Sequence, residues 1–90
     1  MTRQNVRLAL GEMEEDAEYK SMMDSSLDPN FNALRQEVDM AGIRLFQLPP
    51  HEAPESELDG RLERMLAHCV GPLVRFKPFI ENARLILHAT

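Results

Sequence analysis

The chain has 90 residues, of which 43% are hydrophobic and 28% are charged. This length fits one domain and excludes a (β/α)₈ barrel or a two-domain dinucleotide-binding enzyme, and the composition is typical of a globular chain rather than a disordered one. The net charge is −5 and the single cysteine is Cys69, which excludes a disulfide framework and a zinc site built from four cysteines.

A lone cysteine suits a reducing compartment. No apolar run approaches the roughly 18–20 residues that cross a bilayer, and the start of the chain holds no apolar stretch long enough for a signal peptide. We therefore expect a cytoplasmic protein without a membrane partner.

The first predicted helix spans about residues 3–23. Its apolar positions recur at spacings of four, three and four residues, which places them on one helical face; they are Val6, Leu10, Met13 and Ala17. The opposite face is rich in carboxylates, and Asp16 and Lys20 are spaced to form an ion pair along the helix.

The second predicted helix, over about 29–47, has the strongest pattern. Asp28 is a favourable N-cap, and Pro29 suits the first helical position, where its missing N–H costs nothing. Apolar residues then follow at spacings of three and four, at Phe31, Leu34, Val38, Ala41, Leu45 and Leu48. Gly42 leaves an alternative in which the helix ends there and residues 43–48 form a short extended stretch; the unbroken spacing favours the helix.

Two further helices are predicted after a proline-rich linker over 49–55. The third spans about 56–70 and ends where Gly71 is followed by Pro72; its apolar face is Leu58, Leu62, Met65, Leu66 and Cys69. The fourth spans about 78–88, because a proline at position 78 is tolerated only in a first turn. The apolar residues of this last segment are Leu73, Phe76, Phe79, Ile80, Ala83, Ile86 and Leu87.

The predicted fold is therefore all-α: a single domain over residues 1–90, with a small four-helix arrangement, short connections and antiparallel neighbours. Charge is uneven along this chain, because residues 12–63 carry a net charge of −10 and residues 64–90 carry +3. The simplest interpretation is that the basic C-terminal segment packs beside the acidic body and relieves its repulsion. The alternative is that the C-terminal face meets a polyanion.

No residue pattern in the chain is typical of catalysis or of cofactor binding. The three histidines, His51, His68 and His88, are far apart in sequence, and the four glycines are isolated, so metal-ligand spacing and phosphate-binding loops are missing. We expect Cys69 to fill the core as a small apolar side chain. The sequence thus predicts a non-enzymatic protein with no catalytic residue, metal or cofactor.

Two short fragments are similar to parts of known families. Asp24-Ser25-Ser26-Leu27 resembles the Asp-Ser-Leu of acyl carrier proteins, but there a helix follows the serine directly, whereas Pro29 here forces a new helix start. The segment 38–43 resembles the turn of helix-turn-helix proteins, but Pro49-Pro50 would end a recognition helix too early. The chain is therefore assigned to no family, and a carrier or a very small enzyme stays the third-ranked hypothesis.

The remaining signal is a surplus of apolar residues in the first segment. Leu8, Tyr19, Met22 and Met23 lie off the apolar face of the first predicted helix, and methionine is common on surfaces that accept varied partners. We therefore predict an acidic protein-interaction module, acting as an adaptor, regulator or chaperone-like protein, which binds another protein or a second copy of itself through these residues. The alternative function is a nucleic-acid-associated regulator that uses Arg75, Lys77 and Arg84, although few bases are available for phosphate contacts.

Overall fold

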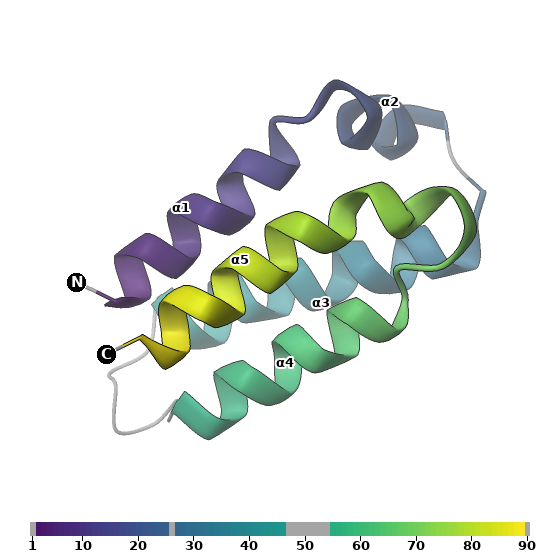
Figure 1. Cartoon of the computed structure of the whole chain (residues 1–90). Helices are drawn as coiled ribbons and strands as arrows, with labels where there is room; N and C mark the ends of the chain where they lie inside the picture. Colours follow the sequence, from purple (N-terminus) through teal and green to yellow (C-terminus); the bar gives the residue numbers. More distant parts are fainter. Residues whose placement is uncertain (1, 26, 47–54, 90) are drawn as a thin grey trace.

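Four antiparallel helices enclose one apolar core in the part of the chain that the structure describes (Figure 1). The structure is a computed structural model that describes residues 2–25, 27–46 and 55–89. The four helices are α1 (Thr2–Glu14), α3 (Pro29–Phe46), α4 (Glu55–Ala67) and α5 (Lys77–His88). Each packs on the next along the chain, and α5 packs on α1, so the four helices close into a ring. The predicted all-α, four-helix arrangement with antiparallel neighbours is confirmed.

The bundle is small and elongated. Its extents are 37 × 21 × 20 Å and its radius of gyration is 12.6 Å, close to the value of about 12 Å expected for a compact domain of this length. The first and last helices lie side by side, so the two ends of the described chain lie at one end of the bundle (Figure 1). Within the described residues, no helix combines the length and the apolar character that a membrane span requires.

The prediction of one continuous helix over 3–23 is wrong. The chain breaks after α1, and a separate short helix, α2 (Ala17–Ser25), turns across the end of the bundle (Figure 1). Asp16 causes the restart, because its Oδ1 accepts hydrogen bonds from the backbone N–H of Glu18 at 2.9 Å and of Tyr19 at 3.4 Å. An aspartate that caps the free N–H groups of a new helix stabilises that helix at the expense of the old one.

The break changes which side chains of the first segment face inward. Val6, Leu10 and Met13 are buried as predicted, but Ala17 is exposed because it opens the new helix. The predicted ion pair between Asp16 and Lys20 is also wrong: the Lys20 ammonium lies 2.8 Å from Glu15 instead.

The second prediction is confirmed over α3. Asp28 caps the helix, since its carboxylate accepts from the backbone N–H of Asn30 at 2.8 Å, and the helix continues through Gly42 without interruption. This excludes the extended alternative as far as Phe46, and with it a helix-turn-helix junction at 38–43. Along the predicted apolar face the buried positions are Phe31, Leu34, Val38 and Ala41; the side chain of Leu45 and all of Leu48 lie outside the described part.

The third helix ends earlier than predicted, at Ala67 rather than residue 70. The last turn tightens instead, since the N–H groups of His68 and Cys69 donate to the carbonyls of Met65 and Leu66, three residues back, at 3.1 and 3.0 Å. Gly71 takes a positive φ of 58°, which glycine adopts at little cost. The segment before the last helix is a 3₁₀-helix, η2 (Gly71–Phe76), which runs directly into α5. The predicted linker over 49–55 lies outside the described residues except for Glu55, the first residue of α4.

The apolar faces predicted for the last two helices form the core. The buried members are Leu58, Leu62, Met65, Cys69, Leu73, Phe76, Ile80, Ala83 and Leu87, while Leu66, Phe79 and Ile86 are partly buried against them. Glu37 also joins α3 to α4, since its Oε2 lies 3.0 Å from Arg61 Nη1 and 3.5 Å from Arg64 Nε. The side chains of Glu37 and Arg61 are mostly shielded from solvent, whereas that of Arg64 is exposed.

Candidate protein-binding surface

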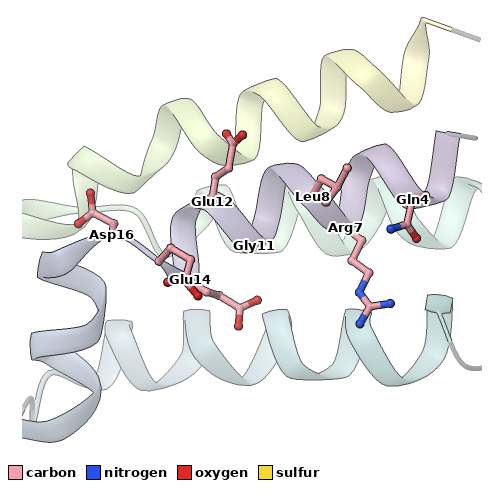
Figure 2. Close-up of a pocket in the computed structure, with 8 residues that line it drawn as sticks. Gln4, Arg7, Leu8, Gly11, Glu12, Glu14 and Asp16 are labelled. Atoms are coloured by element: carbon pink, nitrogen blue, oxygen red, sulfur yellow. The ribbon is translucent and has the colours of Figure 1, made fainter.

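The outward side of α1 carries an open groove. Gln4, Leu8, Gly11 and Glu15 follow one another at spacings of four, three and four, on the side opposite the buried Val6–Met13 stripe. Because these spacings match the helical repeat, the four residues form one straight stripe facing away from the core. They line an open groove of about 860 Å³, together with Arg7, Glu12, Glu14 and Asp16. We call this surface the α1 face (Figure 2).

Shape on the α1 face comes from one leucine and one glycine. Leu8 is 56% exposed, a large fraction for an apolar side chain of this size. Gly11, one turn further on, has no heavy atom within 4 Å of the position that a Cβ would occupy. An exposed apolar side chain thus lies one turn from an open position that carries no side chain, and helices that interlock place the side chains of one helix at such positions of the other.

The charged residues of the α1 face separate by sign along the helix. Arg7 extends toward α3, whereas Glu12 points away from it (Figure 2). Glu14 also lies on the side of α3: partial burial raises the pKa of its carboxyl, the carboxylates of Asp39 and Glu15 raise this pKa further, and Arg7 lowers it. The N-terminal half of the face is therefore basic, and its C-terminal end is a crowd of carboxylates that a cation would stabilise.

Asp16 closes the C-terminal end of the groove and holds α2 and η2 in place. Its oxygens lie 3.2 and 3.3 Å from Nη2 of Arg75, in addition to capping α2. Desolvation raises the pKa of Asp16, but the hydrogen bonds from the N–H groups of Glu18 and Tyr19 and from Arg75 outweigh it and hold the pKa below its usual range. The acid end of the α1 face is thus tied to the C-terminal segment.

The structure separates the four predicted partner-binding residues. Leu8 and Met23 are exposed, at 56% and 42%, and Met22 is partly buried against the core. Tyr19 does not belong to a surface: it is 1% exposed, and its ring meets those of Phe31 and Phe76 edge-on, with centroids 5.2 and 5.5 Å away. The prediction failed because it continued the register of α1 through the break at Asp16.

Other exposed apolar side chains were missed by the sequence patterns. The described residues include Leu27 at 93%, Leu85 at 70%, Val74 at 52% and Val70 at 47%. Leu85 and the partly buried Leu66 line a smaller groove of about 340 Å³ between α4 and α5. The exposure of Leu27 was predictable from the sequence, since a residue directly before an N-cap and a proline lies in a connection and not in a helix.

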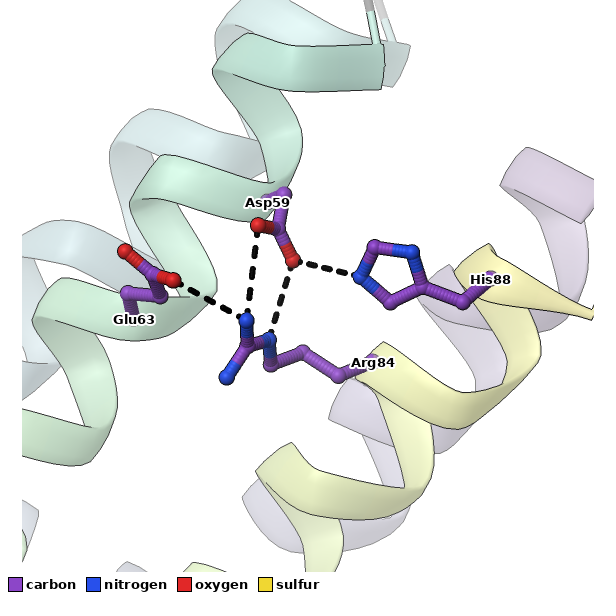
Figure 3. A network of polar contacts seen from close by, with 4 residues as sticks. All are labelled: Asp59, Glu63, Arg84 and His88. Carbon is purple, nitrogen blue, oxygen red and sulfur yellow. Dashed lines mark hydrogen bonds and ion pairs between the residues drawn. The ribbon is translucent and has the colours of Figure 1, made fainter.

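The basic residues proposed for nucleic acid lie in acidic surroundings. Arg75 pairs with Asp16, as described above. Arg84 Nε lies 2.9 Å from Asp59 Oδ1, its Nη2 lies 3.0 Å from Glu63, and His88 lies 2.8 Å from the same Asp59 oxygen (Figure 3). The hydrogen bonds from Arg84 and His88 lower the pKa of Asp59. The third residue, Lys77, is exposed in the first turn of α5. The basic segment therefore packs against the acidic body, as the simpler reading of the charge pattern predicted.

The remaining candidates for chemistry lie apart from the α1 face. Cys69 is 4% exposed, its thiol donates to the carbonyl of Met65 at 3.3 Å, and burial raises the pKa of this thiol; a protonated, buried thiol is a poor nucleophile. Ser25 ends α2, and its hydroxyl donates to the carbonyl of Ser21, while Ser26 and His51 lie outside the described residues. Over the described ranges, no three His, Cys, Asp or Glu residues are grouped to hold a metal ion.

The fold is thus an antiparallel four-helix bundle with a short crossing helix. No protein-family model, curated protein or solved structure matches the chain. The surface of the bundle is therefore what indicates its function.

Proposed function

We propose that this protein is a protein-interaction module, of the adaptor, regulator or chaperone-like kind, that binds its partner through the α1 face. The observation that carries the proposal is the exposed Leu8 beside the open position at Gly11. Single exposed leucines are common on protein surfaces. Here, however, the leucine lies in a groove along a regular helix and is flanked by charges of both signs, which is the composition of a helix-docking surface.

The carboxylates around Glu12 and Glu14 give this surface its specificity. Charged rims act mainly on the rate of encounter and on the choice of partner, while the apolar centre supplies most of the affinity. A partner suited to the α1 face has an apolar side chain that covers Leu8 or fills the space at Gly11, and a basic side chain that reaches the carboxylates. Met23 on α2 provides a further exposed apolar side chain for contact.

The nucleic-acid alternative has weaker support. Two of its three bases, Arg75 and Arg84, already contact carboxylates, so phosphate would have to displace those carboxylates. Phosphate binding also gives affinity that falls steeply with salt concentration, whereas an interface centred on Leu8 is far less sensitive to salt. Measuring complex formation at low and high salt separates the two functions.

Deleting the first segment would not test this proposal, because α1 supplies Val6, Leu10 and Met13 to the core. A photo-crosslinking amino acid at position 8 of the full chain is a better test. The matched control places it at position 85, where the native leucine is even more exposed but lies on α5. We expect a discrete adduct at position 8 that an excess of unmodified chain suppresses, and little adduct at position 85. Equal labelling at both positions, or none at position 8, would contradict the proposed function.

A further inference from the structure

We propose that the partner seated on the α1 face is a second copy of this chain, whose α1 lies antiparallel to the first across a two-fold axis. The inference rests on the proposed function and names the partner of that same surface. It is drawn from the order of residues along the stripe, from the shape at Gly11 and from the placement of the charges.

The outward stripe of α1 is complementary to the same stripe on a second copy whose α1 runs in the opposite direction. If the two-fold axis passes between positions 9 and 10, Leu8 of each copy lies opposite Gly11 of the other, and Gln4 lies opposite Glu15. Since a two-fold interface repeats every contact, the Leu8 side chain of each copy occupies the open position at Gly11 of the other. The spacing of four, three and four residues is the one that keeps a stripe in contact with a second helix over several turns.

The space beyond the Cα of Gly11 is open, as it is at the other glycines, but only Gly11 lies one turn from the exposed Leu8 on the same stripe. Glycine is less favourable than alanine in the interior of an exposed helix, and nothing within the chain itself fills the position. An apolar side chain of a second helix fits there, since the missing Cβ allows close approach of the two backbones.

The charges distinguish the antiparallel orientation from the parallel one. Arg7 and Glu14 are seven residues apart, hence on the same flank of α1, and both lie toward α3. In an antiparallel pair the same flanks meet, so Arg7 of each copy lies on the same flank as Glu14 of the other, about 3 Å along the helix axis from the level of that residue. The carboxylate of Glu14, which Arg7 of its own chain already stabilises, thereby gains a second guanidinium. A parallel pair would bring the two sets of carboxylates at Glu12, Glu14 and Glu15 together and would be repelled.

The size of the contact sets the expected strength. A helix of 13 residues is about 20 Å long, so two such helices bury a small interface and associate weakly. The dimer should therefore form in the micromolar range and dissociate on dilution, and measurements must extend to about 1 mM.

Sedimentation equilibrium on the full chain tests the proposal through two charge reversals. Arg7→Glu places a carboxylate on the flank near Glu14 of the other copy, and Glu14→Arg places a guanidinium near Arg7, so each variant alone should dimerise at least about tenfold more weakly than the native chain. In an equimolar mixture of the two variants every Arg7–Glu14 contact becomes complementary again, and the dimer should return as a heterodimer. Lys77→Glu, a reversal away from the α1 face, should leave dimerisation unchanged.

Each outcome of these measurements either supports or overturns the proposed dimer. A native chain that keeps the mass of one copy at all concentrations overturns the proposal, and so does a dimer that the mixture fails to restore. Should a single variant lose its helical circular dichroism, the double variant Arg7→Glu/Glu14→Arg carries the test, because it must dimerise with itself. If the chain is monomeric but the crosslinker at position 8 captures one other protein competitively, the dimer is refuted and the proposed function stands.

Discussion

Replacing Tyr19 by alanine tests the placement of α2, and therefore the end of the α1 face. The side chain is fully buried and contacts Phe31 and Phe76 edge-on. Burying an aromatic ring removes about 150–250 Å² from water, and truncating a core aromatic residue costs about 3–5 kcal/mol. We therefore expect Tyr19→Ala to lower the free energy of unfolding by about 4 kcal/mol, a large part of the roughly 5–13 kcal/mol available to a chain of this length.

The control is Tyr19→Phe, which keeps the ring and should cost less than about 1 kcal/mol. Urea denaturation followed by far-ultraviolet circular dichroism measures both values. If Tyr19→Ala lost less than about 1 kcal/mol, the ring would not belong to the core. The original assignment of Tyr19 to a partner-binding surface would then regain its basis.

The same residue gives a pH test, because it is the only tyrosine in the chain. Burial raises the pKa of Tyr19, and the carboxylates of Glu14 and Asp39 raise it further. In the unfolded chain the phenol of Tyr19 ionises at a pH of about 10. Just above that pH the folded chain still holds this proton, whereas the unfolded chain has lost it. Stability should be unaffected below that pH and should fall as the pH rises above it. Phenolate absorbance should appear together with unfolding, and the Tyr19→Phe variant should lack this loss.

Four further substitutions test the capping, turn and ion-pair assignments. Asp28→Ala removes the N-cap of α3 and should cost about 1 kcal/mol, measured by urea denaturation; no loss would mean that the cap does not hold the helix start. Gly71→Ala should cost about 1–2 kcal/mol because of the positive φ, whereas Gly60→Ala, inside α4 with open space at its Cβ, should raise stability by up to about 1 kcal/mol; equal effects would refute the turn geometry. Since Arg84 lowers the pKa of Asp59, the charged carboxylate stabilises the fold above pH of about 4, and this contribution is lost as the pH falls through the lowered pKa. Asp59→Asn should therefore flatten the acid limb of a stability-against-pH curve, and an unchanged limb would show that the contact is not made in solution.

The proposed dimer gives a physical role to an otherwise unfavourable pair of surface residues. A mid-helix glycine weakens an isolated bundle slightly, and a small domain has little stability to spare. A second chain that fills the space at Gly11 and removes Leu8 from water would offset this loss. Association would then raise the stability of each copy with protein concentration.

Local signals along the chain determined most of the helices. For α3, a cap at Asp28, a proline at the first helical position and a regular apolar spacing all act over a few residues, so the sequence alone predicted its start and its buried side. The break at Asp16 was also encoded locally, by a good N-cap residue and by the fading of the apolar stripe at Lys20. The sequence analysis missed the break because the helical spacing up to Ala17 indicated one continuous helix, and Asp16 was considered only as an ion-pair partner of Lys20.

Tertiary structure decided what the first segment presents to a partner. Tyr19 is buried because η2, more than 50 residues later in the chain, brings Phe76 against it, and Asp16 is held by Arg75 from the same segment. No pattern within one helix encodes such contacts, since they depend on where the chain returns after several turns. The spacing of residues in the sequence determines the outward stripe on α1. Only the packing of α3 and α5 on the other side of α1 shows that this stripe is exposed to solvent.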